Sequence, residues 1–355
     1  MPQLAPERKK TTFIAFCLIS IAVVIIVVSL GVWTFQYGPL ARRLNSQPTA
    51  ISISPLSHSN TTISPLLFGT NMALFDSNDL LLSSENARIR VQSLHPGIIR
   101  MPVRSSLSEE IEMRAARTIR ELRAVPLINL RGAVDTFVLA DDTRIVQDMQ
   151  QVFKGSNVYY EYGNEEDLQG VTAEKYTASW NQIIPQLKRL APQAHFIGPA
   201  NFQYNESYLK AFLQHARPTP DEVSWHEYTC NVGQAPATCI ANIAHWTSHI
   251  TRARTMMQQV SGHALPIMIT EWNYAADATA NDGKNNNPDF IQNWTKLALQ
   301  TLAANRIFAA MQYSCTNTAV PLVTNNATLS MQGESFQAQY QQMIIEQHVP
   351  AALSS

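Results

Sequence analysis

Charge is scarce in this sequence. Only 15% of its 355 residues are Asp, Glu, Lys or Arg, and 26 basic residues nearly balance 27 acidic ones. The chain therefore lacks the basic excess with which nucleic-acid-binding domains meet phosphates, and we expect no nucleic-acid partner. Hydrophobic residues make up 45% of the chain, whereas disordered chains combine low hydrophobicity with high net charge. A folded domain with an apolar core is expected.

Several short motifs are missing as well. The sequence contains no G-x-G-x-x-G for a dinucleotide, no G-x-x-x-x-G-K for a phosphate and no G-x-S-x-G around a nucleophilic serine. It also lacks the H-x-H pair that metal-dependent barrels carry on an early strand, and no cysteines and histidines follow zinc-ligand spacing. Those enzyme classes are poor fits, and we predict neither a cofactor nor a bound metal.

A long uncharged stretch precedes the folded domain. No charged residue occurs between Lys10 and Arg42, and residues 13–36 are almost wholly apolar. About 20 apolar residues suffice to cross the hydrocarbon core of a bilayer, whereas the apolar part of a secretory signal peptide is shorter and precedes a small-residue cleavage site. We therefore predict a transmembrane signal-anchor at 13–36, a short cytoplasmic tail at 1–12 and a Ser-, Pro-, Asn- and Thr-rich tether at 37–64.

Charge and cysteine usage predict the compartment. Arg8, Lys9 and Lys10 face only two arginines across the predicted span, a slight bias that favours a cytoplasmic N-terminus. Cys230 and Cys239 stand nine positions apart around a glycine and a proline. A disulfide between them suits an extracytoplasmic domain and is favoured over two free thiols. The sequence thus predicts a single-pass membrane protein whose folded domain is extracytoplasmic.

From residue 65 onward, short apolar runs alternate with longer stretches of helical period. This alternation predicts a (β/α)8 TIM barrel at 65–350, followed by a tail at 351–355. An open, doubly wound sheet is the structural alternative, but eight strands argue for closure. The predicted strands are 66–71, 97–103, 126–131, 158–165, 195–200, 223–228, 266–272 and 307–313. The predicted helices are 111–122, 172–190, 204–215, 240–260, 290–302 and 334–348.

Glutamates stand at the ends of two predicted strands, Glu165 on the fourth and Glu271 on the seventh. The active site of a (β/α)8 barrel is built at the C-terminal ends of its strands, and strands four and seven lie across the barrel mouth from each other. Hydrolysis of a glycosidic bond with retention needs one carboxyl group to protonate the leaving oxygen and a second to attack the anomeric carbon. A salt bridge is the simpler explanation for one such glutamate, whereas catalysis is favoured for the pair.

Aromatic residues also stand near predicted strand ends. Trp272 follows Glu271, and Tyr313 is the last residue of the eighth predicted strand. Aromatic rings offer flat faces against which the apolar side of a sugar ring can pack. We therefore predict both side chains as substrate-binding residues.

The two glutamate segments resemble those of clan A of the glycoside hydrolases, the retaining (β/α)8 glycosidases. Asn164-Glu165 is similar to the clan's Asn-Glu pair at the end of strand four, and the segment around Glu271 is similar to its nucleophile segment at strand seven. The resemblance implies that Glu165 is the general acid/base, that Glu271 is the nucleophile and that Asn164 binds the sugar 2-hydroxyl.

Three further residues match the clan's pattern. Arg100 corresponds to a strand-two arginine near the nucleophile, and His226 and Tyr228 correspond to a strand-six His-x-Tyr pair whose tyrosine contacts the nucleophile. The departures include two at single residues: Glu166 replaces a common proline, and the eighth strand does not end in the tryptophan that often forms the floor of the sugar site. The resemblance implies a retaining glycoside hydrolase acting on carbohydrate. A transglycosylase and a non-catalytic carbohydrate-binding barrel are the alternatives.

Overall fold

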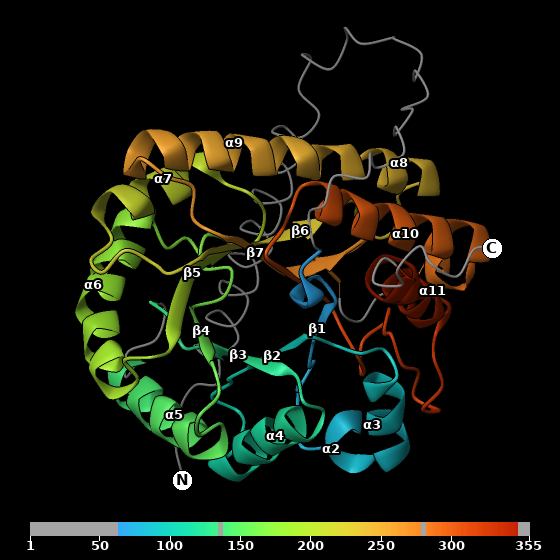
Figure 1. The fold of residues 1–355 in the computed structure, drawn as a ribbon, viewed down its shortest axis with the longest axis horizontal. Helices are drawn as coiled ribbons and strands as arrows, with labels where there is room; N and C mark the ends of the chain where they lie inside the picture. The colour runs from blue at the N-terminus through green and yellow to red at the C-terminus, as the bar shows by residue number, and fades with distance from the viewer. Residues whose placement is uncertain (1–62, 134–137, 278–281, 347–355) are drawn as a thin grey trace, which may run out of the picture. The chain divides into compact units, whose positions relative to one another are not determined.

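Eight parallel strands close into a barrel. In the computed structural model, which describes residues 63–133, 138–277 and 282–346, each strand pairs in parallel with the next, and the last pairs with the first. This closure confirms the predicted (β/α)8 barrel, and Figure 1 shows the strands inside a ring of helices. The strands are β1 (Gly69–Asn71), β2 (Ile98–Pro102), β3 (Val125–Leu130), β4 (Tyr159–Tyr162), β5 (His195–Asn201), β6 (Val223–Tyr228), β7 (Ile267–Asn273) and β8 (Ala309–Gln312).

Helices link successive strands and pack on the outside of the barrel (Figure 1). Most begin at a side-chain cap; Ser108, for example, accepts a hydrogen bond from the Ile111 amide. The α-helices are α2 (Leu80–Ser83), α3 (Glu85–Gln92), α4 (Glu109–Glu121), α5 (Val138–Val152), α6 (Ala173–Leu190), α7 (Glu206–His215), α8 (Pro236–Ala241), α9 (Ile243–Ser261), α10 (Pro288–Ala304) and α11 (Met331–Tyr340). Shorter helical turns lie at Pro65–Leu67, Lys284–Asn286 and Gln341–Ile345.

Some helix predictions were wrong in detail. The predicted helix 240–260 is two helices, α8 and α9, which meet at Asn242. The short helix α3 was not predicted, because it buries only Ala87 and Val91 and its apolar stripe is therefore too thin to show a clear helical period. The helix α5 was not predicted either, although it buries Val138, Ile145, Val146, Met149 and Val152 against the barrel.

The interior of the barrel has an apolar layer below a charged one. The apolar cluster inside the strands consists of Ile98, Leu127, Tyr159, Ile197, Met268, Ala309 and Met311. Side chains two residues apart in a strand point to the same side, so Arg100 follows Ile98 inward, and Glu161 follows Tyr159. Each of these polar residues lies nearer the C-terminal end of its strand than the apolar residue before it. The charged side chains of the barrel interior therefore lie toward its C-terminal mouth.

The predicted N-terminal segments cannot be compared with the fold. The cytoplasmic tail 1–12, the signal-anchor 13–36, most of the tether 37–64 and the tail 351–355 lie outside the described residues. Within the described part of the chain, no helix is both long enough and apolar enough to cross a bilayer.

The predicted disulfide between Cys230 and Cys239 is present, with the two Cα atoms 5.0 Å apart. Cys230 lies just after β6, and Cys239 lies in α8, where its side chain is fully buried. The bridge therefore ties the loop that leaves the barrel mouth at β6 to the helix that follows it.

We expect the double substitution Cys230→Ser/Cys239→Ser to lower the free energy of unfolding by about 2–3 kcal/mol, the loop-entropy value for a bridge that closes about ten residues. Urea unfolding with and without a thiol reductant measures this. The reductant should lower the unfolding midpoint of the wild-type protein and leave that of the variant unchanged. An equal effect of reductant on both proteins would contradict the assignment.

Candidate active site

Arg100 joins three strands at the floor of the barrel mouth. From β2, its buried guanidinium reaches Glu161 Oε2 through Nε at 2.6 Å and Glu271 Oε1 through Nη1 at 2.6 Å. Its Nη2 donates to Asn164 Oδ1 at 2.7 Å. Burial lowers the pKa of Arg100, but the charges of Glu161 and Glu271 outweigh this effect, so the pKa is raised above its ordinary value. One permanent cation therefore holds two carboxylates in place.

Both carboxylate oxygens of Glu271 are engaged. Oε1 accepts from Arg100, and Oε2 accepts a hydrogen bond of 2.6 Å from the hydroxyl of Tyr228 in β6. Burial raises the pKa of Glu271, but the charges of His226 and Arg100, together with hydrogen bonds from Tyr228 and Arg100, outweigh burial and hold the pKa below its ordinary value. Glu271 is therefore kept ionised, and its oxygens are fixed in direction.

Glu165 lies on the loop after β4 rather than within the strand. The predicted strand 158–165 ends at Tyr162, and the chain then turns through Gly163 and Glu165, which have φ angles of 82° and 52°. The amide of Glu165 donates to the carbonyl of Ala200 in β5 at 2.9 Å. This bond ties the loop to the neighbouring strand and fixes Glu165, which is in a left-handed conformation uncommon for a residue other than glycine.

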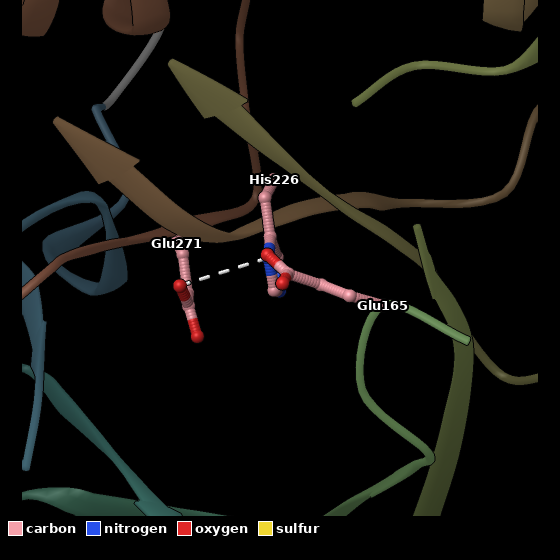
Figure 2. A group of neighbouring side chains, drawn as sticks. All are labelled: Glu165, His226 and Glu271. Atoms are coloured by element: carbon pink, nitrogen blue, oxygen red, sulfur yellow. Dashed lines mark hydrogen bonds and ion pairs between the residues drawn. The ribbon is translucent and has the colours of Figure 1, made fainter. Parts of the chain in front are cut away.

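His226 connects the two glutamates. Its Nδ1 lies 2.7 Å from Glu165 Oε1 and 3.6 Å from Glu271 Oε2, and Figure 2 shows the three side chains converging. One oxygen of each glutamate and a ring nitrogen of His226 all lie within 4.8 Å of one another. Burial lowers the pKa of His226, but Glu271 and Glu165 outweigh this effect and raise it. The ring therefore lies against two carboxylates of different exposure, whose charges favour its protonated form.

The glutamates open onto a cavity of about 600 Å³, within the range of small-molecule sites. The predicted site residues that line it are Arg100, Asn164, Glu165, Tyr228, Glu271 and Tyr313. His226 is fully buried behind them and reaches the site through its bonds to the glutamates. These residues come from five different predicted strands, and the fold brings them together.

Trp272 lies elsewhere, and the prediction that it packs against a sugar was wrong. Its side chain is fully buried between the barrel and the helices, with its ring 5.9 Å from Trp294 and 6.4 Å from Trp246. Neighbouring residues in a strand point to opposite faces, so a Glu271 that faces the barrel mouth directs Trp272 toward the helices. The alternation of inward and outward side chains along β7 was the signal against this prediction.

Other residues of the site were not predicted. Asn71 at the end of β1 accepts from Arg100 Nη1 at 3.3 Å and donates to the carbonyl of Thr270 at 3.1 Å. Glu161 was missed although a carboxylate inside an apolar strand is itself a signal, because such a group needs a partner to offset burial. Glu166, the departure from the clan's proline, is buried and accepts a bond of 2.5 Å from the Ala133 amide.

We expect Arg100→Met to lower the free energy of unfolding by about 3–5 kcal/mol at pH 7, the usual cost of breaking a buried ion pair. The deficit should shrink toward pH 4.5. In the wild-type protein the lowered pKa of Glu271 contributes stability above its ordinary pKa, and this is lost as the pH falls through the lower value. Without Arg100 the pKa of Glu271 rises, so Glu271 takes up a proton at a higher pH than in the wild-type protein.

Urea unfolding at both pH values measures the Arg100→Met effect. The control is Arg252→Met, which removes an arginine from the exposed pair with Glu206 and should cost at most about 1 kcal/mol. A deficit for Arg100→Met that does not change with pH would contradict the interpretation.

Comparison with known proteins supports the fold. No protein-family profile and no curated protein matches the sequence. Solved structures do match. A family 51 α-L-arabinofuranosidase from Bifidobacterium longum aligns with a TM-score of 0.59 at 12% identity, covering 78% of this chain and 73% of that one. A glucosidase from Croceicoccus marinus has a TM-score of 0.59 at 12% identity, with coverages of 79% and 68%.

A family 5 endoglucanase of broad specificity from Clostridium longisporum aligns along its full length, covering 80% of this chain and 100% of that one, with a TM-score of 0.55 at 11% identity. At such identities a structural likeness establishes the fold alone. The structural neighbours of this chain are glycoside hydrolases of families 51 and 5, and it shares with them the eight-stranded parallel barrel.

Proposed function

We propose that this protein is a retaining glycoside hydrolase that cleaves O-glycosidic bonds through Glu165 and Glu271. The observation that carries the proposal is that a carboxylate oxygen of each glutamate and a nitrogen of His226 lie within 4.8 Å of one another. Retaining glycosidases hold their two carboxyl groups about 5–5.5 Å apart, whereas inverting enzymes leave about 6.5–9.5 Å for a water molecule. The glycoside hydrolases among the structural neighbours add support.

The environments of the two glutamates suit different roles. Glu271 is ionised and held by Arg100 and Tyr228, which favours attack on an anomeric carbon. The Glu165 side chain is 23% exposed, against 9% for Glu271, and among the described residues it hydrogen-bonds to His226 alone. A more open carboxyl group can reach the oxygen of a departing sugar or alcohol. Glu165 is therefore the proposed general acid, and Glu271 is the proposed nucleophile.

In the proposed reaction, Glu165 gives its proton to the glycosidic oxygen while Glu271 forms a bond to the anomeric carbon. The alcohol leaves, and the negative charge of Glu271 is consumed in the ester. Glu165, now ionised, takes a proton from water, whose oxygen attacks the same carbon and releases Glu271. His226 faces both carboxylates in turn and can follow the shift of charge between them.

Asn164 fits a role in sugar binding. Its Oδ1 accepts from Arg100, which fixes the amide and leaves Nδ2 without a protein partner in the described part of the chain. Nδ2 can donate to a sugar hydroxyl within the cavity. Because Oδ1 accepts from Arg100, the amide is held in the orientation in which Nδ2 is the group left to donate to the sugar.

We expect Glu165→Gln and Glu271→Ala each to lower turnover of a 4-nitrophenyl glycoside by at least about 100-fold, the lower range for loss of a positioned acid or base. Azide distinguishes their roles. With Glu271→Ala it occupies the vacated space, attacks the anomeric carbon directly and gives a glycosyl azide of inverted configuration. With Glu165→Gln it attacks the glycosyl-enzyme and gives the retained azide.

Proton NMR of the azide products determines their anomeric configuration in both variants. The matched control is Glu174→Gln, on the exposed face of α6, which should keep wild-type turnover. Full activity in either active-site variant would contradict the assignment. If the wild-type protein binds glycosides without cleaving them, it is a binding barrel. If it transfers the sugar to added alcohols in preference to water, it is a transglycosylase.

A metal-dependent hydrolase is a weaker alternative. Glu165, His226 and Glu271 are close enough to ligate one ion. However, the guanidinium of Arg100 and the hydroxyl of Tyr228 already occupy the two oxygens of Glu271, and a fixed cation 2.6 Å from a carboxylate opposes a second one. Wild-type turnover should therefore persist in excess EDTA, assayed beside the azide experiments.

We also propose that the protein is anchored to a membrane by residues 13–36, with the barrel on the extracytoplasmic side. The uncharged apolar stretch supports the anchor, and the Cys230–Cys239 bridge supports an oxidising compartment.

The full chain should sediment with membranes, resist an alkaline carbonate wash and enter detergent, because removing about 20 apolar residues from a bilayer is costly. A chain without residues 1–45 should stay in the supernatant. Recovery of the full chain in the soluble fraction would exclude the anchor.

A further inference from the structure

The cavity is lined by arginines in addition to Arg100. Arg104 lies on the loop between β2 and α4, and Arg131 lies just after β3; both line the same space of about 600 Å³ as the two glutamates. Both are only partly exposed. A neutral sugar does not explain why a cavity holds a partly buried cation that has no carboxylate partner, because burying an unpaired charge is unfavourable.

The three arginines differ in how their charge is balanced. Arg100 is paired with two carboxylates at 2.6 Å. Arg131 has Asp141 at 3.6 Å. Arg104 donates from Nε to the carbonyl of Leu74 and from Nη2 to that of Ala73, both at 3.1 Å, and no carboxylate of the described residues lies within salt-bridge distance of it. Carbonyl oxygens orient this guanidinium, but they do not neutralise it.

The orientation of Arg104 leaves it able to bind an anion. Nη1 makes no hydrogen bond to the described residues, and Nη2 has a second hydrogen beyond the one given to Ala73. These two nitrogens form one of the edges of the guanidinium that can take a carboxylate in a bidentate pair. The adjacent edge, Nε with Nη2, is held by the carbonyls, and the centroid of the Phe75 ring, 41% exposed, lies 5.1 Å from the guanidinium carbon.

Arg104 lies on the nucleophile's side of the cavity. Arg104 donates to the carbonyls of Ala73 and Leu74, which follow β1, and Asn71 at the end of β1 donates to the carbonyl of Thr270, the residue before Glu271. Tyr313 and Glu271 are both cavity residues. In the proposed reaction the sugar that becomes bonded to Glu271 occupies this side, so the charge of Arg104 faces that sugar rather than the leaving group.

We propose that the sugar transferred to Glu271 is an acidic one, a uronic acid, and that Arg104 pairs with its carboxylate. This proposal rests on the glycoside hydrolase function proposed above and names its substrate class. Arg104 is then the residue that determines specificity, while Phe75 beside it offers a ring against which the apolar face of the sugar can pack.

The test uses the full-length protein and two pairs of substrates that differ only at C6, 4-nitrophenyl β-D-glucuronide against the β-D-glucoside and the galacturonide against the galactoside. We expect a higher kcat/KM for the uronide in at least one pair. Arg104→Gln should lower kcat/KM for that uronide about 10- to 100-fold, the size of a lost charged hydrogen bond, and change the neutral partner less than about threefold. Arg104→Lys should retain an intermediate preference.

Ionic strength gives an independent measurement on the wild-type protein. The KM of the uronide should rise with added salt while that of the neutral partner stays constant, because salt screens only the charged contact. Free glucuronate should likewise inhibit more strongly than free glucose. These measurements stand even if Arg104→Gln fails to fold because it loses the bonds to Ala73 and Leu74.

The outcomes separate this inference from the function on which it rests. Cleavage of the neutral member in preference to the uronide in both pairs would overturn the acidic specificity and leave the glycosidase proposal intact. An equal loss for both members in Arg104→Gln would make Arg104 a structural residue and overturn its assigned role. Failure of the wild-type protein to cleave any glycoside would instead overturn the proposed function.

Discussion

The ion pairs of Arg100 are the constraint on which the site depends. A carboxylate inside a barrel is unfavourable unless a cation and hydrogen bonds offset its burial. Arg100 does this for Glu161 and Glu271 together, at 2.6 Å each, and through Asn164 it also fixes the loop that carries Glu165. Because one planar group makes all three contacts, the positions of β2, β4 and β7 and the direction of the Glu271 carboxylate are linked.

This link gives two chemically identical side chains different surroundings. Glu271 has both oxygens engaged by groups that favour the ionised form, whereas Glu165 lies on a loop with His226 as its hydrogen-bonding partner. Both glutamates raise the pKa of His226, whose Nδ1 faces each of them. In a site of low dielectric, a change of charge at one carboxylate is felt strongly at the other. The geometry therefore suits a reaction in which protonation and ester formation alternate.

The sequence predicted the barrel and most of the site because both depend on period and position. Alternation of strand and helix fixed the order of eight strands, and strand ends located Glu165 and Glu271. Trp272 was misassigned because a position near a strand end was taken as enough for a sugar contact, although neighbours in a strand face opposite ways. Glu161 and Arg104 were missed for a different reason. Their importance lies in which charges have partners, and partners 61 residues apart, such as Arg100 and Glu161, are set by the closed barrel.

The division between strands and loops also bears on specificity. The side chains proposed to perform the reaction are anchored on strands or tied to one, as Arg100, Tyr228 and Glu271 are. Phe75, Arg104 and Arg131 lie on the loops that follow strands. Loops of a (β/α)8 barrel can change without disturbing the sheet. Neighbours with the same barrel are described as an arabinofuranosidase, a glucosidase and an endoglucanase. The substrate of this chain therefore has to be inferred from its own loops, where the charge of Arg104 is the feature that a neutral sugar leaves unexplained.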